Sequence, residues 1–118
     1  MKQYKVLIVD DDRRVRDGLV ALLATSPGIK SVTEAASGRE AIQLAAKILP
    51  DVVLMDVQMR EMDGIKATRL IKEAWPKIKI IVLTIDSKHQ TEALAAGADA
   101  FLIKGFSDET LLKAIYGT

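Results

Sequence analysis

The sequence predicts an α/β fold, in which a five-stranded parallel sheet carries helices on both faces. The main observation is a regular alternation, because five strand-like segments of mostly apolar residues alternate with five segments of helical pattern. Four of the strand segments contain short apolar runs, which is typical of strands buried on both faces of a parallel sheet. Right-handed crossovers between successive strands then place helices on both sides of that sheet.

The first half of the chain supplies three strands and two helices. We expect the strands at residues 4–9, 29–36 and 51–56, and the more polar second strand suits a sheet edge. Pro27-Gly28 ends the first helix, and Pro50 ends the second. Ser37 is the expected N-cap of the second helix, with Glu40 completing a capping box. The apolar stripes of the two helices are Val15, Leu19, Leu22 and Leu23, then Ile42, Ala45 and Leu49.

The second half supplies two strands and three helices. We expect strands at residues 78–84 and 99–104, and helices from Gly64 to Trp75-Pro76, over 88–96 and over 107–116. Gly97 is the expected residue after the end of the short Ala-rich helix, and Ser107 is the expected N-cap of the last one. The inward residues are Ala67, Ile71 and Ala74 in the third helix and Leu111, Leu112 and Ile115 in the last.

Composition bounds the classes of function. The 118 residues suffice for one domain with a sizeable core, and we take residues 1–118 as that domain. The formal net charge of +1 does not indicate a dedicated nucleic-acid surface. The absence of cysteine excludes disulfides, thiolate metal sites and cysteine nucleophiles. Because no stretch resembles a signal peptide or a membrane span, we expect a cytoplasmic protein without membrane contact.

Four of the apolar runs end in polar residues that can handle a phosphoryl group. Asp10-Asp11-Asp12 follows the first strand, and Asp56, Thr84 and Lys104 end the third, fourth and fifth. In an open α/β sheet, ligands bind outside the carboxyl ends of the strands, so these side chains should converge on one edge. Carboxylates hold a hard cation, while a hydroxyl and an amine suit phosphate oxygens.

Asp56 is the most informative of these residues. An isolated carboxylate at the end of an almost wholly apolar strand pays a desolvation cost unless a cation or hydrogen-bond donors neutralise it. Mg²⁺ fits that need, because it takes a few carboxylates, retains waters and coordinates phosphate oxygens. A carboxylate oxygen of Asp56 could then attack an incoming phosphoryl group. Simple turn or helix-dipole roles for Asp10, Asp11 and Asp12 are the alternative.

The positions of Thr84 and Lys104 in the sequence make them candidate site residues. Each is the last residue of a strand predicted to lie beside the strands that end in aspartate. Lys104 would counter the charge of the carboxylates and then of the phosphoryl group, and Thr84 would donate a hydrogen bond to a phosphoryl oxygen. We also expect the main chain around Gln58 to supply a carbonyl to the metal.

These motifs together resemble those of one known family. The motifs are Val9-Asp10-Asp11, the run from Asp51 to Met59, Met62-Asp63-Gly64, Leu83-Thr84 and the run from Gly97 to Lys104. Over essentially its full length, the chain resembles the receiver domain of two-component response regulators. The last block resembles the branch whose receivers are fused to helix-turn-helix DNA-binding domains of the NarL/FixJ kind. The resemblance implies a flavodoxin-like, doubly wound fold with strand order 2-1-3-4-5, for which a receiver protein is a standard example.

The resemblance also implies roles for individual residues. Asp56 would accept phosphate from a sensor histidine kinase, and Asp10, Asp11 and Asp56 would organise Mg²⁺. Gln58 and Asp86 stand at the two positions that tune dephosphorylation in receivers. Phe101 stands at the aromatic switch position, where it would turn inward when Thr84 moves toward the phosphoryl group; plain core packing is the alternative for this residue. A homodimer or partner contact on the surface formed by the fourth helix, the fifth strand and the fifth helix would follow phosphorylation.

The sequence departs from the family's pattern at three positions. Arg60 stands where the family usually has a proline, which would stiffen the loop. Gly105 follows Lys104 where the family commonly has a proline in a cis peptide, so the isomer of the Lys104–Gly105 bond stays open. Ile85 follows Thr84 in place of a small residue, and a bulky side chain there narrows access to the acyl phosphate.

Two other features receive plainer interpretations. His89, the single histidine, has no evident nucleophile or metal partner in the sequence, so we expect a solvated surface residue. Arg13-Arg14-Val15-Arg16 is predicted to be a solvated first helical turn.

Two other classes of function compete with the receiver. An aspartyl-nucleophile phosphohydrolase needs a second acid two residues after the nucleophile, where this chain has Gln58, and it needs a cap or a larger pocket. A nucleotide or flavin binder needs a glycine-rich turn after the first strand, and that turn is missing. We expect no direct DNA binding by this domain, and the chain is expected to be either a free-standing receiver or the first piece of a longer transcriptional regulator.

Overall fold

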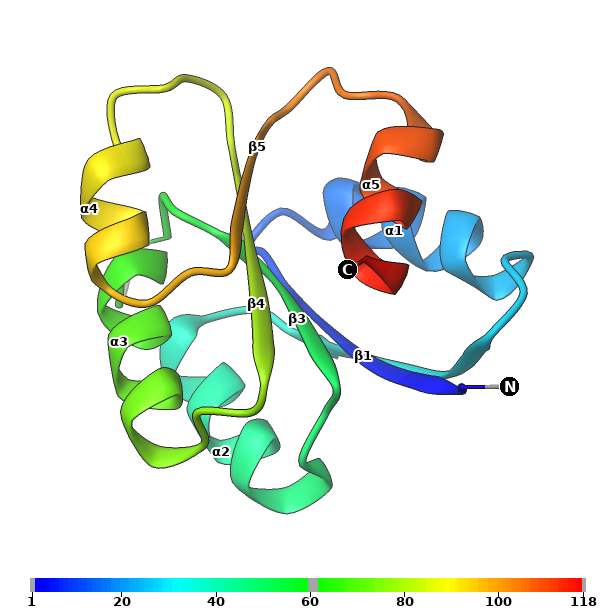
Figure 1. The fold of residues 1–118 in the computed structure, drawn as a ribbon, viewed down its shortest axis with the longest axis horizontal. Helices are drawn as coiled ribbons and strands as arrows, with labels where there is room; N and C mark the ends of the chain where they lie inside the picture. Colours follow the sequence, from blue (N-terminus) through cyan, green and yellow to red (C-terminus); the bar gives the residue numbers. More distant parts are fainter. Residues whose placement is uncertain (1, 60–61, 118) are drawn as a thin grey trace.

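The computed structural model describes residues 2–59 and 62–117 as a sheet between two layers of helices (Figure 1). The strands are β1 (Tyr4–Val9), β2 (Ile29–Ala35), β3 (Val52–Asp56), β4 (Lys79–Thr84) and β5 (Ala100–Ile103). All neighbouring strands are parallel, in the order β2-β1-β3-β4-β5. The predicted strand order is therefore confirmed, and each strand ends within a residue of its expected place.

The helices are α1 (Arg13–Ala24), α2 (Gly38–Ile48), α3 (Gly64–Ala74), α4 (Gln90–Ala95) and α5 (Asp108–Tyr116). Helices α1 and α5 cover one face of the sheet, and α2, α3 and α4 cover the other (Figure 1). One apolar cluster lies under each layer, because successive strand residues point to opposite faces. β3 is buried along its whole length, which makes it the centre of the fold.

Side chains fix where the helices begin. Ser37 and Ser107 accept hydrogen bonds from the main-chain N–H groups of the third residue beyond them, so both predicted N-caps are confirmed. The Glu40 carboxylate accepts from the main-chain N–H of Ala36, one residue before the cap. Asp63 caps α3 in the same manner, whereas Asp12 caps α1 by accepting from the N–H of Arg14, the second residue beyond it.

Two residues that the sequence predicts on the buried apolar faces of helices are exposed instead. Leu49 does not lie on the inner face of α2, because that helix ends at Ile48. Leu49 takes the left-handed conformation at φ 47° and is 53% exposed. Ala74 is also exposed, since the buried stripe of α3 ends at Ile71. α4 is shorter than expected, and His89 occupies its N-cap position.

Gly64 allows α3 to begin directly against the end of β3. A Cβ atom built at this position would lie 1.8 Å from the carbonyl oxygen of Asp56, so any side chain would push the helix away. The Gly64 N–H also donates to the Val57 carbonyl at 2.8 Å. This contact fixes the chain that follows Asp56, and with it the position of the Asp56 carboxylate.

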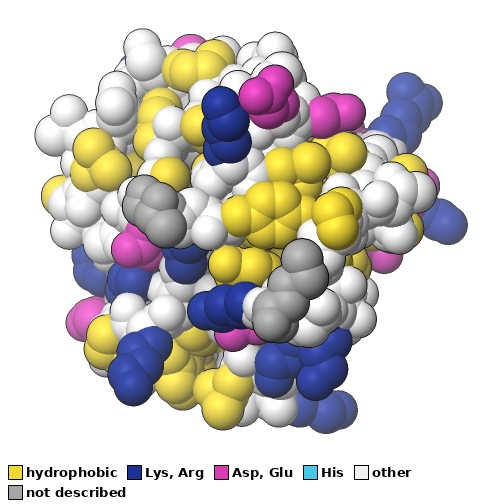
Figure 2. Space-filling model, turned by 45° about the vertical axis from the view of Figure 1, so that its right-hand side comes forward, with side chains coloured by type: hydrophobic (Ala, Val, Ile, Leu, Met, Phe, Trp, Pro, Cys, Tyr) yellow, Lys and Arg dark blue, Asp and Glu magenta, His cyan; other side chains and the backbone are white. Residues whose placement is uncertain are grey.

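The face of the molecule drawn in Figure 2 carries side chains of mixed character. On the face drawn in Figure 2, apolar side chains gather near the centre, and basic and acidic side chains both lie around them. The longest described helix, α1, has 12 residues, and no helix in the described ranges has the length and apolar character that a membrane crossing needs.

Candidate functional site

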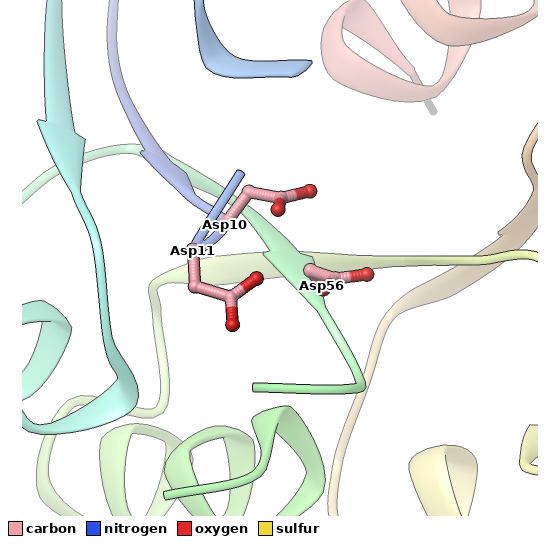
Figure 3. A group of neighbouring side chains, drawn as sticks. All are labelled: Asp10, Asp11 and Asp56. Carbon is pink, nitrogen blue, oxygen red and sulfur yellow. The ribbon is translucent and has the colours of Figure 1, made fainter. Parts of the chain in front are cut away.

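Three carboxylates come together at the carboxyl edge of the sheet. Asp10 follows β1 and Asp56 ends β3, and these two strands are neighbours; Asp11 extends from the turn beside them (Figure 3). One oxygen from each carboxylate lies within 4.8 Å of the others. Asp10 and Asp56 are only 3% and 7% exposed, whereas Asp11 is open to solvent. The sequence-predicted acidic cluster is thus present as a geometric group.

Lys104 reaches this cluster from the far side of β4. Its Nζ lies 3.0 Å from Asp56 Oδ1 and 3.3 Å from Asp10 Oδ2. The Lys104 main-chain N–H donates to the carbonyl of Thr84, the buried last residue of β4. The four strand-end residues that the sequence singles out therefore meet at one edge.

Burial and charge act together on the two central groups. Burial raises the pKa of the Asp56 carboxyl and the charges of Asp10 and Asp11 raise it further, although the hydrogen bond from Lys104 opposes both effects. Burial alone would lower the pKa of Lys104, but its contacts with Asp56 and Asp10 outweigh this and raise it. Lys104 therefore remains a cation, and ionised Asp56 has a high free energy that a further cation would reduce.

Asp11 and Asp12 are adjacent in the chain, but their carboxylates have different roles. The Asp12 carboxylate accepts the main-chain N–H of Arg14 at 2.9 Å and so caps α1. Its own main-chain N–H donates to Asp10 Oδ1 at 2.9 Å, which holds that carboxylate in place. Asp11, not Asp12, belongs to the group of oxygens that could share a metal ion.

A small cavity opens above the three carboxylates. Its volume is about 180 Å³, and its lining residues are Asp10, Asp11, Asp12, Val15, Asp56, Gln58, Thr84, Ile85 and Lys104. Its lining thus combines acidic groups with the Lys104 side chain and Thr84. Ile85 is 66% exposed at this cavity. Gln58 is among the lining residues, and Asp86 is not; the Asp86 carboxylate instead accepts the Lys88 main-chain N–H.

Phe101 lies on β5 opposite Val82 of β4, partly buried against the apolar cluster beneath α2, α3 and α4. The Lys104–Gly105 peptide is trans, as are the other peptides of the described ranges, and Gly105 has φ 106°. Arg60, the first departure from the family pattern, lies outside the described residues.

Two plainer interpretations of the sequence are wrong. His89 is not a solvated residue, because its side chain is 22% exposed and its Nε2 is buried without a hydrogen-bond partner among the described residues. It lies at the start of α4, beside a groove that also borders Lys66 and Arg69. Arg16 is not solvated either. Its side chain is 15% exposed and donates both to the main-chain carbonyl of Asp10, just after β1, and to the Glu34 carboxylate on β2. Helical spacing alone did not reveal these tertiary contacts.

Comparison with known proteins decides the family. Residues 6–116 match the model of the response regulator receiver domain. The chain belongs to this receiver family. It is 43% identical over 116 residues to response regulator protein VraR of Staphylococcus aureus, covering 97% of this chain and 56% of that protein. The chain thus spans little more than half the length of this relative.

Solved structures agree with that assignment. A two-component response regulator of the LuxR family from Aurantimonas superposes with a TM-score of 0.90 at 32% identity, over 98% of this chain and 84% of that one. The Vibrio cholerae chemotaxis protein CheY4 gives 0.88 at 33% identity, over 97% of both chains. The chain is therefore a receiver domain of two-component signalling, a family that is in general not enzymatic toward separate substrates. The comparisons do not support an aspartyl-nucleophile phosphohydrolase.

The acidic site suits the magnesium ion that receivers generally bind. Its three carboxylates present oxygen ligands within reach of one cation, and oxygen is the donor that Mg²⁺ prefers. Burial of Asp10 and Asp56 beside one ammonium group adds an electrostatic reason for a cation here. The residues present therefore fit the metal that the family implies.

Proposed function

We propose that this receiver accepts a phosphoryl group on Asp56 from a sensor histidine kinase and changes conformation in response. The observation that supports this most strongly is the placement of the Asp56 carboxylate. It ends the fully buried strand β3, lies with Asp10 and Asp11 in one group of oxygens, and contacts the Lys104 ammonium at 3.0 Å.

In the proposed reaction, a carboxylate oxygen of Asp56 attacks the phosphorus atom of phosphohistidine. An oxygen–phosphorus bond forms, the nitrogen–phosphorus bond breaks, and the imidazole takes up a proton. Asp10, Asp11, Asp56 and the main-chain carbonyl of Gln58 would hold Mg²⁺, which when bound supplies positive charge to the phosphoryl oxygens. Lys104 Nζ would move its hydrogen bonds from the carboxylates to the phosphoryl group. Water later attacks the same phosphorus atom, the bond between that atom and the Asp56 oxygen breaks, and inorganic phosphate leaves, so that the carboxylate is regenerated.

The conformational response is assigned to Thr84 and Phe101. The phosphoryl group on Asp56 would carry nearly two negative charges, in place of the single charge of the carboxylate, and strong acceptor oxygens to which the Thr84 hydroxyl would donate. Thr84 lies at the end of β4, and Phe101 pairs with Val82 two residues earlier, so movement of Thr84 would free space beside the aromatic ring. Thr84→Ala should still be phosphorylated but should lose most of the amide NMR shifts that beryllofluoride causes in β4 and at Phe101. A full wild-type response in this variant would contradict the coupling.

The partners follow from the same proposal. The phosphodonor would be a histidine kinase in the cytoplasm, and homodimerisation would accompany phosphorylation. Because the chain spans 56% of VraR, we infer that residues 1–118 form the receiver of a longer regulator with a helix-turn-helix output domain. Transcription would then be the regulated process, and the receiver itself would not contact nucleic acid.

The experiment that tests this function is incubation with acetyl phosphate and Mg²⁺. The wild-type chain should gain one base-labile phosphate per molecule, located at Asp56 by mass spectrometry. Asp56→Asn should gain none while keeping the same circular dichroism spectrum. Stoichiometric phosphorylation of Asp56→Asn would contradict the assignment of the acceptor. Many turnovers of acetyl phosphate per molecule without a stable phosphoprotein would instead support the phosphohydrolase.

A further inference from the structure

Arg16 links the acidic site to the edge strand of the sheet. Its Nη1 donates to the main-chain carbonyl of Asp10 at 2.6 Å, and its Nε donates to the Glu34 carboxylate at 3.1 Å. Glu34 lies on β2 opposite Ile8 of β1, one residue from the end of that strand. The Arg16 side chain is largely buried between these two acceptors, which distinguishes it from the exposed arginines of the same helical turn.

The carbonyl that Arg16 holds belongs to the peptide that joins Asp10 to Asp11. A peptide group is planar, so fixing its oxygen also fixes the direction in which the Asp11 residue leaves it. Other contacts hold the rest of Asp10. Its N–H donates to the Ala35 carbonyl, and its two carboxylate oxygens accept from Asp12 and Lys104. Arg16 thereby completes the restraint of this turn at the point where Asp11 begins.

We propose that Arg16 is a positioning residue for the metal site, and that it orients Asp11 through the Asp10 carbonyl with Glu34 as its anchor. This inference rests on the proposed function, because it takes Asp10, Asp11 and Asp56 as the ligands of Mg²⁺. Arg16 does not touch the metal or the phosphoryl group in this account. Its planar guanidinium is suited to the task, since one rigid group meets a carbonyl and a carboxylate at once.

Charge and position predict opposite effects when Arg16 is replaced. A positive charge near three carboxylates opposes the binding of a second cation, so its removal should strengthen Mg²⁺ binding if charge were its only influence. Loss of the restraint on the Asp10–Asp11 peptide should weaken Mg²⁺ binding, because the ligands would no longer be held in place. The sign of the change therefore separates a positioning role from a purely electrostatic one.

The test is calorimetric titration of Mg²⁺ into the unphosphorylated chain at constant ionic strength. Arg16→Met keeps much of the length and apolar contact of the side chain, and it should weaken Mg²⁺ affinity by about tenfold, which is typical of lost ligand support. Arg13→Met is the matched control, because it removes the same charge from the same turn at an 85% exposed side chain. Its affinity should change by less than about twofold, since salt screens an exposed charge.

Glu34→Gln tests the same link from an exposed strand position, where the core is not disturbed. It should weaken Mg²⁺ binding in the wild-type background and have no further effect in the Arg16→Met background, because both changes break one network. A loss of equal size in both backgrounds would show that Glu34 acts through its charge alone and would overturn its role as an anchor.

Failure of the inference is distinguishable from failure of the proposed function. If the wild-type chain binds Mg²⁺ and Arg16→Met binds it equally well or more tightly, the positioning role is wrong and the metal site stands. If the wild-type chain binds no Mg²⁺, the metal part of the proposed function is wrong, and the positioning role is overturned with it. Thermal unfolding of each variant shows whether it is folded. If Arg16→Met is not, Arg16→Lys carries the test, because it keeps the charge and loses the planar guanidinium, so undiminished Mg²⁺ affinity in Arg16→Lys would overturn the positioning role.

Discussion

Lysines at the two edges of the sheet show how differently the same residue type is used. At the amino edge, Lys72 Nζ donates to the carbonyls of Pro76 and Ile78 and to Asp99, at distances of 2.9, 2.9 and 3.0 Å. Three acceptors match the three donors of an ammonium group, and one carboxylate balances its charge. At the carboxyl edge, Lys104 contacts two carboxylates, Asp10 and Asp56, both of which are buried.

At the amino edge, one carboxylate balances the charge of Lys72. At the carboxyl edge, two carboxylates share the single charge of Lys104, so negative charge is in excess. Asp99 also accepts the main-chain N–H of Ile80, so it ties β4, β5 and α3 together as a structural joint. Two buried carboxylates around one ammonium leave a formal charge of −1. Burial raises the pKa of Asp56, and the negative charges of Asp10 and Asp11 raise it further. A fold can thus satisfy its charges where it needs stability and leave them crowded where a ligand is to bind.

The largest effect on stability is expected at the amino edge. Asp99→Ala should lower the free energy of unfolding by about 2 kcal/mol, because the Ile80 N–H loses its acceptor and the Lys72 ammonium loses the one carboxylate among its three acceptors. Glu109→Ala is the control, since its ion pair with Lys113 is almost fully exposed and should be worth less than about 0.5 kcal/mol. Urea denaturation measures both values, and equal losses would mean that Asp99 is only a surface charge.

At the carboxyl edge, we expect a substitution to raise the free energy of unfolding, by less than Asp99→Ala lowers it. Because the folded-state pKa of Asp56 is raised, its contribution to stability is fully present below its unfolded pKa and is lost as pH rises through the folded pKa. Near neutral pH without metal, Asp56→Asn should therefore raise the free energy of unfolding by about 1 kcal/mol.

This gain should shrink below about pH 4, where the wild-type carboxyl is itself protonated. Denaturation curves at the two pH values measure it. Asp63→Asn is the control, since asparagine caps a helix as well as aspartate does. A loss of stability in Asp56→Asn at neutral pH would mean that the site is not electrostatically crowded.

The smallest effect concerns the lifetime of the proposed phosphoprotein. Gln58 borders the cavity, whereas Asp86 is bonded to its own loop. Gln58→Ala should therefore change the rate of dephosphorylation by about threefold, or roughly 0.6 kcal/mol in the barrier, and Asp86→Ala by less. Decay of the phosphorylated protein after removal of the donor measures both. Unchanged decay in the double variant would remove both residues from any role in tuning.

Much of the fold and of the site could be predicted from local patterns. Apolar runs and their terminal residues indicate the strands, and parallel strands align their carboxyl ends, so Asp10, Asp56, Thr84 and Lys104 could be placed at one edge. The strand order itself came from the resemblance of motifs to the receiver family. Without it, the reach of Lys104 across β4 to Asp10 could not be inferred.

The features that sequence reasoning missed depend on contacts between distant segments. Arg16 seemed to be one of three solvated arginines, and only the proximity of Glu34 on the edge strand distinguishes it. Lys72 and Asp99 are 27 positions apart, and neither belongs to a periodic pattern that predicts their contact. Leu49 fits the helical spacing of α2, which predicts a buried side chain. The helix ends one residue earlier, at Ile48, so Leu49 is exposed although the helical period itself is correct.

The central claim is that the crowded edge is a metal site built from particular aspartates, and one pair of variants tests it most directly. Asp11→Asn and Asp12→Asn remove the same charge from adjacent residues, and asparagine can still cap α1 at position 12. Calorimetric titration should show that Asp11→Asn weakens Mg²⁺ affinity by more than about tenfold, because a ligand is lost. Asp12→Asn should retain it within about threefold, because only a screened charge is lost. Equal losses in the two variants would contradict the account, since they would mean that Mg²⁺ responds to the total charge of this turn and not to a site formed with Asp11.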